Sequence, residues 1–175
     1  MIGAFDSVWS VMMADLHAAP WVANLGITLF ALPMIVLGPR GGRLTQKYGP
    51  FRASIGGLTL GALCMVSYGL LGSPYVMLGF GVFHGIIDGL TITGGSAAIA
   101  LVAPKERLAS AQGLMGGMQT LMGGIAAIAA GATYDAFGRT PTYLVTAGAM
   151  LALIATGSWM AKSSLRINGV IETNE

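Results

Sequence analysis

The sequence has few charged residues and a single cysteine. Only 9% of its 175 residues are charged, against about a quarter in an ordinary soluble domain, and its mean hydropathy is +0.73. This composition argues against a water-soluble globule. The formal net charge of +2 is too small to indicate a nucleic-acid partner. One cysteine, Cys64, excludes an internal disulfide.

Motifs for nucleotides, metals and hydrolysis are also missing. Gly79 and Gly81 are followed by His84 rather than by a third glycine, so there is no dinucleotide fingerprint, and no phosphate loop is present. The chain has no His-Glu-x-x-His and no cysteine pair, so we expect neither a metal nor a cofactor. An intramembrane hydrolase with His84 as base and Ser96 as nucleophile is the enzyme alternative. Ser96 lacks the following glycine of rhomboid-like proteases, so we expect no enzyme.

Long apolar runs dominate what is present. A spanning helix needs about 20 mostly apolar residues, and five runs fit that length. One of them, Leu108 to Thr133, is rich in small residues and carries no charge. The stretch from Met1 to Leu16 is interrupted by Asp6 and is short for a crossing, as in a truncated helix, and it lacks the basic start of a secretory signal. The other four runs are Trp21 to Gly38, Ala53 to Gly72, Tyr75 to Val102 and Thr142 to Ala161.

The basic residues fall almost entirely on one side of the expected membrane. If all five runs cross, eight of the nine Lys and Arg residues share one side, and only Arg139 lies on the other. By the positive-inside rule the basic side faces the cytoplasm, so we expect an inner-membrane protein with a cytoplasmic C-terminus. The basic side holds Arg40, Arg43, Lys47, Arg52, Lys105, Arg107, Lys162 and Arg166.

A short pattern, Gly-x-x-x-polar-x-aromatic-Gly, occurs twice, 89 residues apart. The two copies face opposite sides of the membrane. Each lies between the second and third helices of a three-helix group, if the short first helix is counted. This placement predicts an inverted repeat of three plus three helices. The first copy is Gly42, Gln46, Tyr48 and Gly49, and the second is Gly131, Asp135, Phe137 and Gly138.

The loop around the first copy, residues 42–52 (GRLTQKYGPFR), resembles the signature of the major facilitator superfamily. In that family a Gly-x-Leu-x-Asp-Arg-x-Gly-Arg loop joins the second and third helices of a half. Gln46 replaces the usual acid and Lys47 the usual arginine, which is similar to the copy in the second half. Residues 5–9 resemble the end of the seventh helix and residues 133–139 the turn between the last two. The resemblance implies the C-terminal half of such a transporter, from part of helix seven through helix twelve.

The resemblance also implies secondary transport by alternating access, in which such loops latch the two halves together. Arg43, Lys47 and Gly49 are the better latch candidates, whereas Arg40 and Arg52 fit simple membrane anchors. Such transporters need two halves with the substrate path between them, so we expect a missing N-terminal half or a second copy as partner. The loop residues that the resemblance implies are Gly42, Arg43, Lys47, Gly49 and Arg52.

Asp88 is the residue best suited to a transport role. It lies about halfway along a long apolar run, where an ionised carboxylate costs on the order of 3 kcal/mol and must face water or a partner. His84, four residues earlier, shares its helical face. We expect the two to form a protonation or substrate-contact site, with a structural hydrogen bond to a neighbouring helix as the alternative. Asp6 is a third candidate, as an acid that attracts a cationic substrate.

Glycines in the fifth run predict close helix packing, because their small-xxx-small spacing lets a neighbouring backbone approach. The expected packing residues are Gly113, Gly116, Gly117, Gly123 and Gly124.

These features predict an all-α transmembrane bundle over residues 1–162, followed by a cytoplasmic tail over 163–175. Proton-coupled efflux of a small, partly apolar solute is the preferred function, based on Asp88, on the methionine stripe of Met115, Met118 and Met122, and on similarity to drug-efflux members of the family. Uptake of a sugar or metabolite, and a membrane fragment or accessory module without transport, stay open as alternatives. The expected partners are the lipid bilayer, a small-molecule substrate, protons and the second half, without nucleic acid.

Overall fold

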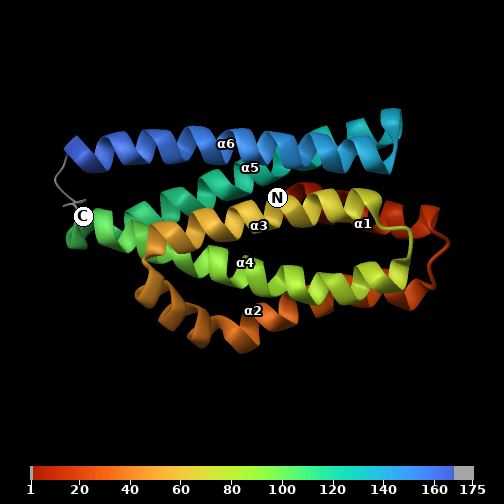
Figure 1. The fold of residues 1–175 in the computed structure, drawn as a ribbon, viewed down its shortest axis with the longest axis horizontal. Coiled ribbons are helices and arrows are strands. Elements are labelled where there is room, and N and C mark those ends of the chain that lie inside the picture. Colours follow the sequence, from red (N-terminus) through yellow and green to blue (C-terminus); the bar gives the residue numbers. More distant parts are fainter. Residues whose placement is uncertain (1, 168–175) are drawn as a thin grey trace.

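The computed structural model describes residues 2–167, with side chains for residues 2–36 and 40–161. Over this range the chain forms α-helices and one 3-10 turn and contains no strand, which confirms the all-α prediction. Figure 1 shows the long helices lying side by side. In chain order the elements are α1 (Ile2–Asp15), α2 (Pro20–Tyr48), α3 (Pro50–Leu70), α4 (Pro74–Val102), η1 (Lys105–Arg107), α5 (Leu108–Phe137) and α6 (Arg139–Ile167).

The helices match the apolar runs because a segment in hydrocarbon must satisfy its backbone N–H and C=O groups within itself. By length and composition α3, α4, α5 and α6 can each cross a membrane, and α2 makes a fifth crossing if its two bent parts are counted as one. At 14 residues, α1 is short for a crossing, as predicted. Helices α2, α3 and α4 all begin with proline, which has no N–H to leave unpaired at that position.

The structure moves the boundaries expected around the basic loop. Helix α2 continues through residues 40–48, which the sequence assigned to a loop, and it bends by 63° between Pro20–Val36 and Arg40–Tyr48. Pro39 lies at the bend, where it removes a helical hydrogen bond. The polar residues after it end the apolar run without ending the helix, because lysine, arginine and glutamine are good helix formers.

The last helix continues past the candidate membrane span, which ends at Ala161. Helix α6 extends to Ile167, so residues 163–167 of the expected tail are helical. Residues 168–175 lie outside the described residues.

Two single glycines separate the paired long helices of each half of the chain. Gly49 joins α2 to α3 with φ of 87°, and Gly138 joins α5 to α6 with φ of 76°. They are the last residues of the two repeat copies, and the same offset of 89 residues relates Tyr48 to Phe137, the ends of α2 and α5. The repeated pattern therefore marks the same tight turn twice, at opposite ends of the bundle (Figure 1).

Helix packing follows the same symmetry. The first helix of each three-helix group packs on the second helix of the other group: α4 packs on α2, and α1 packs on α5. The third helices, α3 and α6, pack on each other. Packing of the first helix of each group on the second helix of the other group is the arrangement expected of an inverted repeat of three plus three helices. Helix α4 also packs on α3, which places it between two neighbours near the centre of the molecule.

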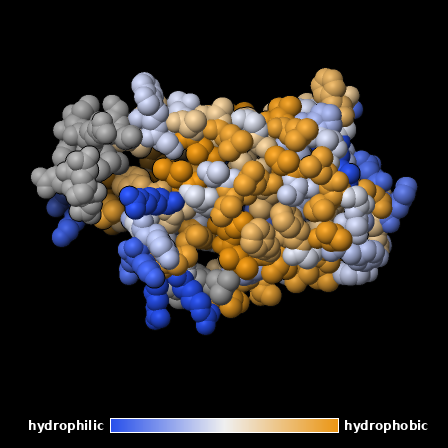
Figure 2. Space-filling view, viewed as in Figure 1, coloured by the Kyte–Doolittle hydropathy of each residue, from blue (hydrophilic) through white to orange (hydrophobic). Residues whose placement is uncertain are grey.

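The two ends of the bundle differ in charge. The α2–α3 and α4–α5 junctions lie at one end, with the C-terminal end of α6, and the remaining junctions and Arg139 lie at the opposite end (Figure 1). Lys162 and Arg166 lie on α6 toward the first end, with side chains outside the described part. Between the ends the visible surface is largely hydrophobic (Figure 2). We name the first end the basic end after its exposed residues Arg40, Arg43, Lys47, Arg52, Lys105 and Arg107.

Aromatic residues mark both edges of this hydrophobic band. At the opposite end, the rings of Trp21 and Tyr75 are 6.0 Å apart and both side chains are exposed. Toward the basic end, Tyr48 and Trp159 are exposed as well. Tryptophan and tyrosine favour the two membrane–water interfaces, so their placement agrees with a bundle that crosses the bilayer along its long axis.

Replacing the turn glycines should destabilise the bundle. Gly49→Ala or Gly138→Ala forces a Cβ into a conformation that only glycine adopts readily, at a cost of about 1–3 kcal/mol. Each variant should therefore unfold at a lower temperature in detergent, as followed by circular dichroism. The matched control is Gly56→Ala inside α3, where a Cβ meets nothing within 4 Å. Equal melting of all three variants would refute the shared role of the two turns.

Candidate functional site

His84 and Asp88 lie together inside α4. Their side chains are 0% and 1% exposed, and His84 Nε2 is 3.9 Å from Asp88 Oδ1. The four-residue spacing places them on one helical face, so the predicted proximity is confirmed. Since α4 crosses the hydrophobic band, the pair is held away from both polar ends of the bundle.

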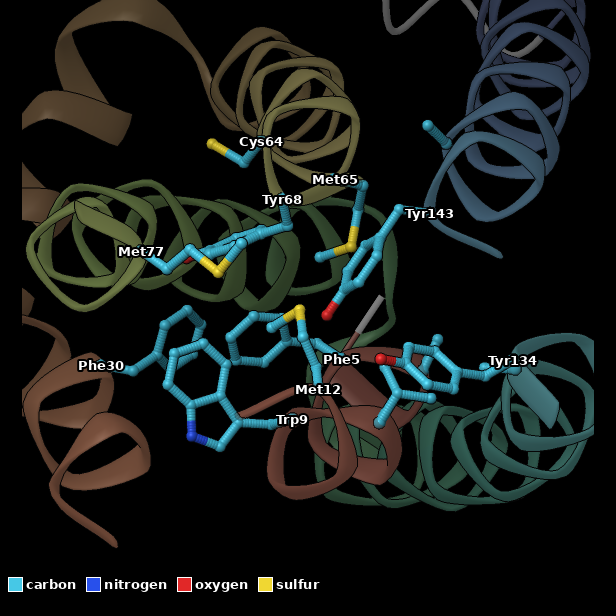
Figure 3. Packing of buried hydrophobic residues seen from close by; sticks show 14 of the residues in the cluster. Phe5, Trp9, Met12, Phe30, Cys64, Met65, Tyr68, Met77, Tyr134 and Tyr143 are labelled. Atoms are coloured by element: carbon cyan, nitrogen blue, oxygen red, sulfur yellow. The ribbon is translucent and has the colours of Figure 1, made fainter. Parts of the chain in front are cut away.

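Aromatic rings from three other helices surround His84. The ring centroids of Phe5 on α1, Phe30 on α2 and Tyr68 on α3 lie 5.7, 5.0 and 5.7 Å from the imidazole centroid. Both phenylalanine rings meet the imidazole nearly edge-on, an arrangement that aromatic rings favour. Figure 3 shows Phe5, Phe30 and Tyr68 pointing toward one another between their helices. We call these three residues the aromatic shell, and it shields the imidazole from solvent.

Glycines on α4 bring α2 close enough to complete the aromatic shell. A Cβ built on Gly85 would collide with the carbonyl oxygen of Phe30, and one built on Gly89 would lie 3.3 Å from the Cα of Met34. A larger residue at either position would push α2 outward. Because Phe30 belongs to the backbone segment that packs on Gly85, its ring reaches His84 only through this close approach.

Trp9 fixes α1 in the middle of the molecule. Its Nε1 donates a hydrogen bond to the Ala23 carbonyl oxygen at 3.0 Å, which ties α1 to α2. The indole lies against Gly26, where a built Cβ would overlap it. Trp9 also packs on Phe5, with ring centroids 5.2 Å apart. These contacts hold Phe5 in position against His84.

The carboxylate of Asp88 has no hydrogen-bond partner for either oxygen among the described residues. A buried, ionised carboxylate without hydrogen bonds is costly in an apolar surrounding. A proton on Asp88 removes that charge, whereas a proton on the nearby imidazole offsets the cost only in part, because it creates a second buried charge.

Asp6 does not join this pair. It lies on the exposed side of α1, whereas Phe5 and Trp9 on the same helix face the core. The structure therefore brings together two of the three acid and imidazole candidates and leaves the third at the surface.

The residues of the basic loop lie on α2, on α3 and at their junction. Gly49 forms the turn itself, and the side chains of Arg43, Lys47 and Arg52 are exposed. Lys47 Nζ lies 5.3 Å from the ring centroid of Tyr48. Within the described residues none of the three cations pairs with an acid.

Gly42 lies on the side of α2 that faces α4. A Cβ built on it would lie 3.9 Å from Thr93 Cγ2 of α4, and one built on Gly41 would lie 3.6 Å from Thr93 Oγ1. This part of the loop region is thus packed against the helix that carries the pair.

The α5 glycines behave differently from the expectation of close packing. A Cβ built on any of them meets no atom within 4 Å among the described residues. Gly123 does contact α1, but through its backbone: a Cβ on Gly3 of α1 would collide with the Gly123 carbonyl oxygen. Their packing role therefore stays a prediction for a partner outside the described chain. The glycines with open space are Gly113, Gly116, Gly117, Gly123 and Gly124.

One polar contact at the opposite end could not be predicted from sequence patterns. The Tyr134 hydroxyl donates a hydrogen bond to Asp15 Oδ2 at 2.8 Å and so joins the end of α1 to α5. The two residues are 119 positions apart, and no local spacing connects them. With Arg139 they border a cavity of about 360 Å³. The aromatic shell is missed for the same reason, because each ring comes from a different helix.

A sequence model described as Major Facilitator Superfamily matches residues 1–166 of the chain. The match covers every described helix except the last residue of α6. A comparison with curated proteins finds no match.

The site depends on the close approach of α2 to α4, and substitution of a single glycine should disturb it. Gly85→Ala should separate the two helices at Phe30 and lower the folded yield and the melting temperature in detergent. Gly79→Ala on the same helix is the control, because a Cβ there meets nothing within 4 Å. If Gly85→Ala melts like the control, α2 and α4 do not meet as described.

Proposed function

Because this chain belongs to the Major Facilitator Superfamily, a family of membrane transporters, we propose that it moves a small solute by alternating access, coupled to protons that bind Asp88. The observation that carries this proposal is the buried pair of His84 and Asp88 within a helix long and apolar enough to cross a membrane. Ionisable residues at such a depth are expensive and mark substrate or proton pathways.

Coupling follows from the charge of the pair. In the closed arrangement a proton on Asp88 removes a charge that the aromatic shell cannot solvate. When the helices part and water enters, the carboxylate gains hydrogen bonds and releases the proton. Each proton state thus stabilises a different conformation, which is the requirement for a ligand to shift a conformational equilibrium. His84 supplies a second protonatable group 3.9 Å away.

The chemistry of the site favours a partly apolar cation as solute. Phe5, Phe30 and Tyr68 supply aromatic rings and Asp88 supplies a single carboxylate, and aromatic rings attract cations. A sugar needs several hydrogen-bonding side chains, and the surroundings of His84 are mainly rings. Exchange of such a cation for a proton at Asp88 gives efflux, whereas sugar or metabolite uptake is the weaker alternative.

The orientation that we propose has the basic end in the cytoplasm of a cell with an inner membrane. Positive residues are retained on the cytoplasmic side during insertion, and the described cations gather at that end. Since α6 ends there too, this orientation places the C-terminal end of α6 on the cytoplasmic side. The exposed Arg43 and Lys47 then act as a latch toward acids of a second half.

A second half or a second copy completes the transporter in this proposal. The open space beside Gly113, Gly116, Gly117 and Gly124 leaves a smooth strip on α5, which lets another helix approach its backbone. We propose that the solute path lies between this chain and that partner, as in transporters built from two related halves.

Asp88→Asn tests the coupling directly, because the amide keeps the size of the carboxyl but cannot exchange its proton. The chain is reconstituted in liposomes under an imposed pH gradient, with ethidium as the cationic probe and glucose as the neutral one. We expect gradient-driven ethidium movement in the original chain and its loss to background in Asp88→Asn, with helical content unchanged. Asp135→Asn, the same change at an exposed position, is the control.

Full proton-coupled ethidium movement in Asp88→Asn would overturn the coupling role. Movement of glucose in place of ethidium would favour uptake of a neutral solute. No movement of either probe, with or without a co-expressed partner half, would identify the chain as a module without transport.

A further inference from the structure

Helices α3 and α6 diverge along their length. At the opposite end they touch: Thr140 Oγ1 donates a hydrogen bond to the Gly69 carbonyl oxygen at 2.6 Å, and the rings of Tyr68 and Tyr143 are 5.9 Å apart. Toward the basic end the contact opens into a groove of about 350 Å³. We call it the α3–α6 groove. Its lining residues are Phe51, Ser54, Ile55, Leu58, Met150, Leu153, Ile154, Gly157, Ser158 and Ala161.

The α3–α6 groove reaches from the basic end to the middle of the hydrophobic band. Its wall on α6 runs from Met150 to Ala161, which is about 16 Å at the helical rise of 1.5 Å per residue. Half of a bilayer's hydrocarbon core is about 15 Å thick. The groove therefore has about the depth of one membrane leaflet.

The width of the groove distinguishes between possible occupants. Counting the part that is open to the surroundings, the groove has about 830 Å³ of empty space, whereas a helix about 10 Å across and about 16 Å long needs about 1,250 Å³. A crossing helix would also need contact along the whole band, and the helices close at Gly69. A single hydrocarbon chain is narrower than a helix, and it does not need to extend past the point where α3 and α6 meet at Gly69.

Charge at the rim indicates the head group. Arg52 follows Phe51 at the mouth of the groove and is exposed, and Arg43 and Lys47 lie on the same end of the bundle. No acid of the described residues pairs with Arg52. Basic residues next to a membrane surface attract anionic lipids by about 1 kcal/mol each.

We propose that the α3–α6 groove binds one acyl chain of an anionic phospholipid, whose head group lies against Arg52. The apolar walls hold the chain, and the arginine selects the head group. The bound lipid fills the space that the diverging helices leave, so it supports the basic half of the α3–α6 contact. This site is separate from His84 and Asp88, and it does not depend on the proposed transport.

The test is native mass spectrometry of the purified chain released from micelles that contain dioleoyl phosphatidylglycerol or dioleoyl phosphatidylcholine. We expect one retained phosphatidylglycerol, bound about tenfold more tightly than phosphatidylcholine. Gly157→Leu, which fills the groove, should lower retention of both lipids about tenfold. Arg52→Gln should remove the preference for phosphatidylglycerol. Gly148→Leu on the same helix, outside the groove and with open space beside it, should change nothing.

Ile55→Trp fills the groove from the α3 wall and replaces Gly157→Leu if that variant does not fold. Unchanged lipid retention in the folded groove-filling variant would overturn the proposal. Equal retention of the two lipids by the original chain would overturn the role of Arg52. A dimer that Gly157→Leu dissociates would show that a second copy, not a lipid, occupies the groove.

Discussion

Every element of this fold depends on hydrogen bonding of the backbone in hydrocarbon. A peptide N–H or C=O in the bilayer core finds no water, so it must bond within its own helix. Long helices with turns as short as Gly49 and Gly138 are the result. The same surroundings reverse the usual pattern of exposure. Large apolar side chains such as Leu114, Ile128 and Leu153 are exposed over much of their surface, because acyl chains solvate them as well as a protein core would.

In such a fold the buried polar groups carry the function. Aromatic and methionine side chains make up most of the hydrophobic core cluster, and His84 and Asp88 are an ionisable pair buried beside it. Their position follows from the close packing of α2 on α4 at Gly85 and from the anchoring of α1 by Trp9. A proposed proton site in the core and a proposed lipid site in the α3–α6 groove thus share one physical basis, the low polarity of everything around them.

Much of this arrangement could be predicted from local patterns, and the remainder could not. The helices and the His84–Asp88 proximity follow from run length and four-residue spacing. The helical extension to Tyr48 was not predicted, because polarity ends an apolar run before it ends a helix. Gly85 and Gly117 look alike in sequence, yet among the described residues a Cβ on Gly85 would meet another helix and one on Gly117 would meet nothing within 4 Å. Helices that are apolar on all sides carry no periodic signal for their rotation, so the aromatic shell could not be predicted.

The most direct test of this account is the sidedness of its two equivalent turns. In a chain with Cys64→Ala, single cysteines replace Tyr48 or Phe137, the exposed last residues of α2 and α5. A membrane-impermeant maleimide is then applied to intact cells and to inverted vesicles. The inverted repeat predicts that position 137 labels only in intact cells and position 48 only in inverted vesicles. Labelling of both positions from the same side would contradict the five crossings and the transporter that is built on them.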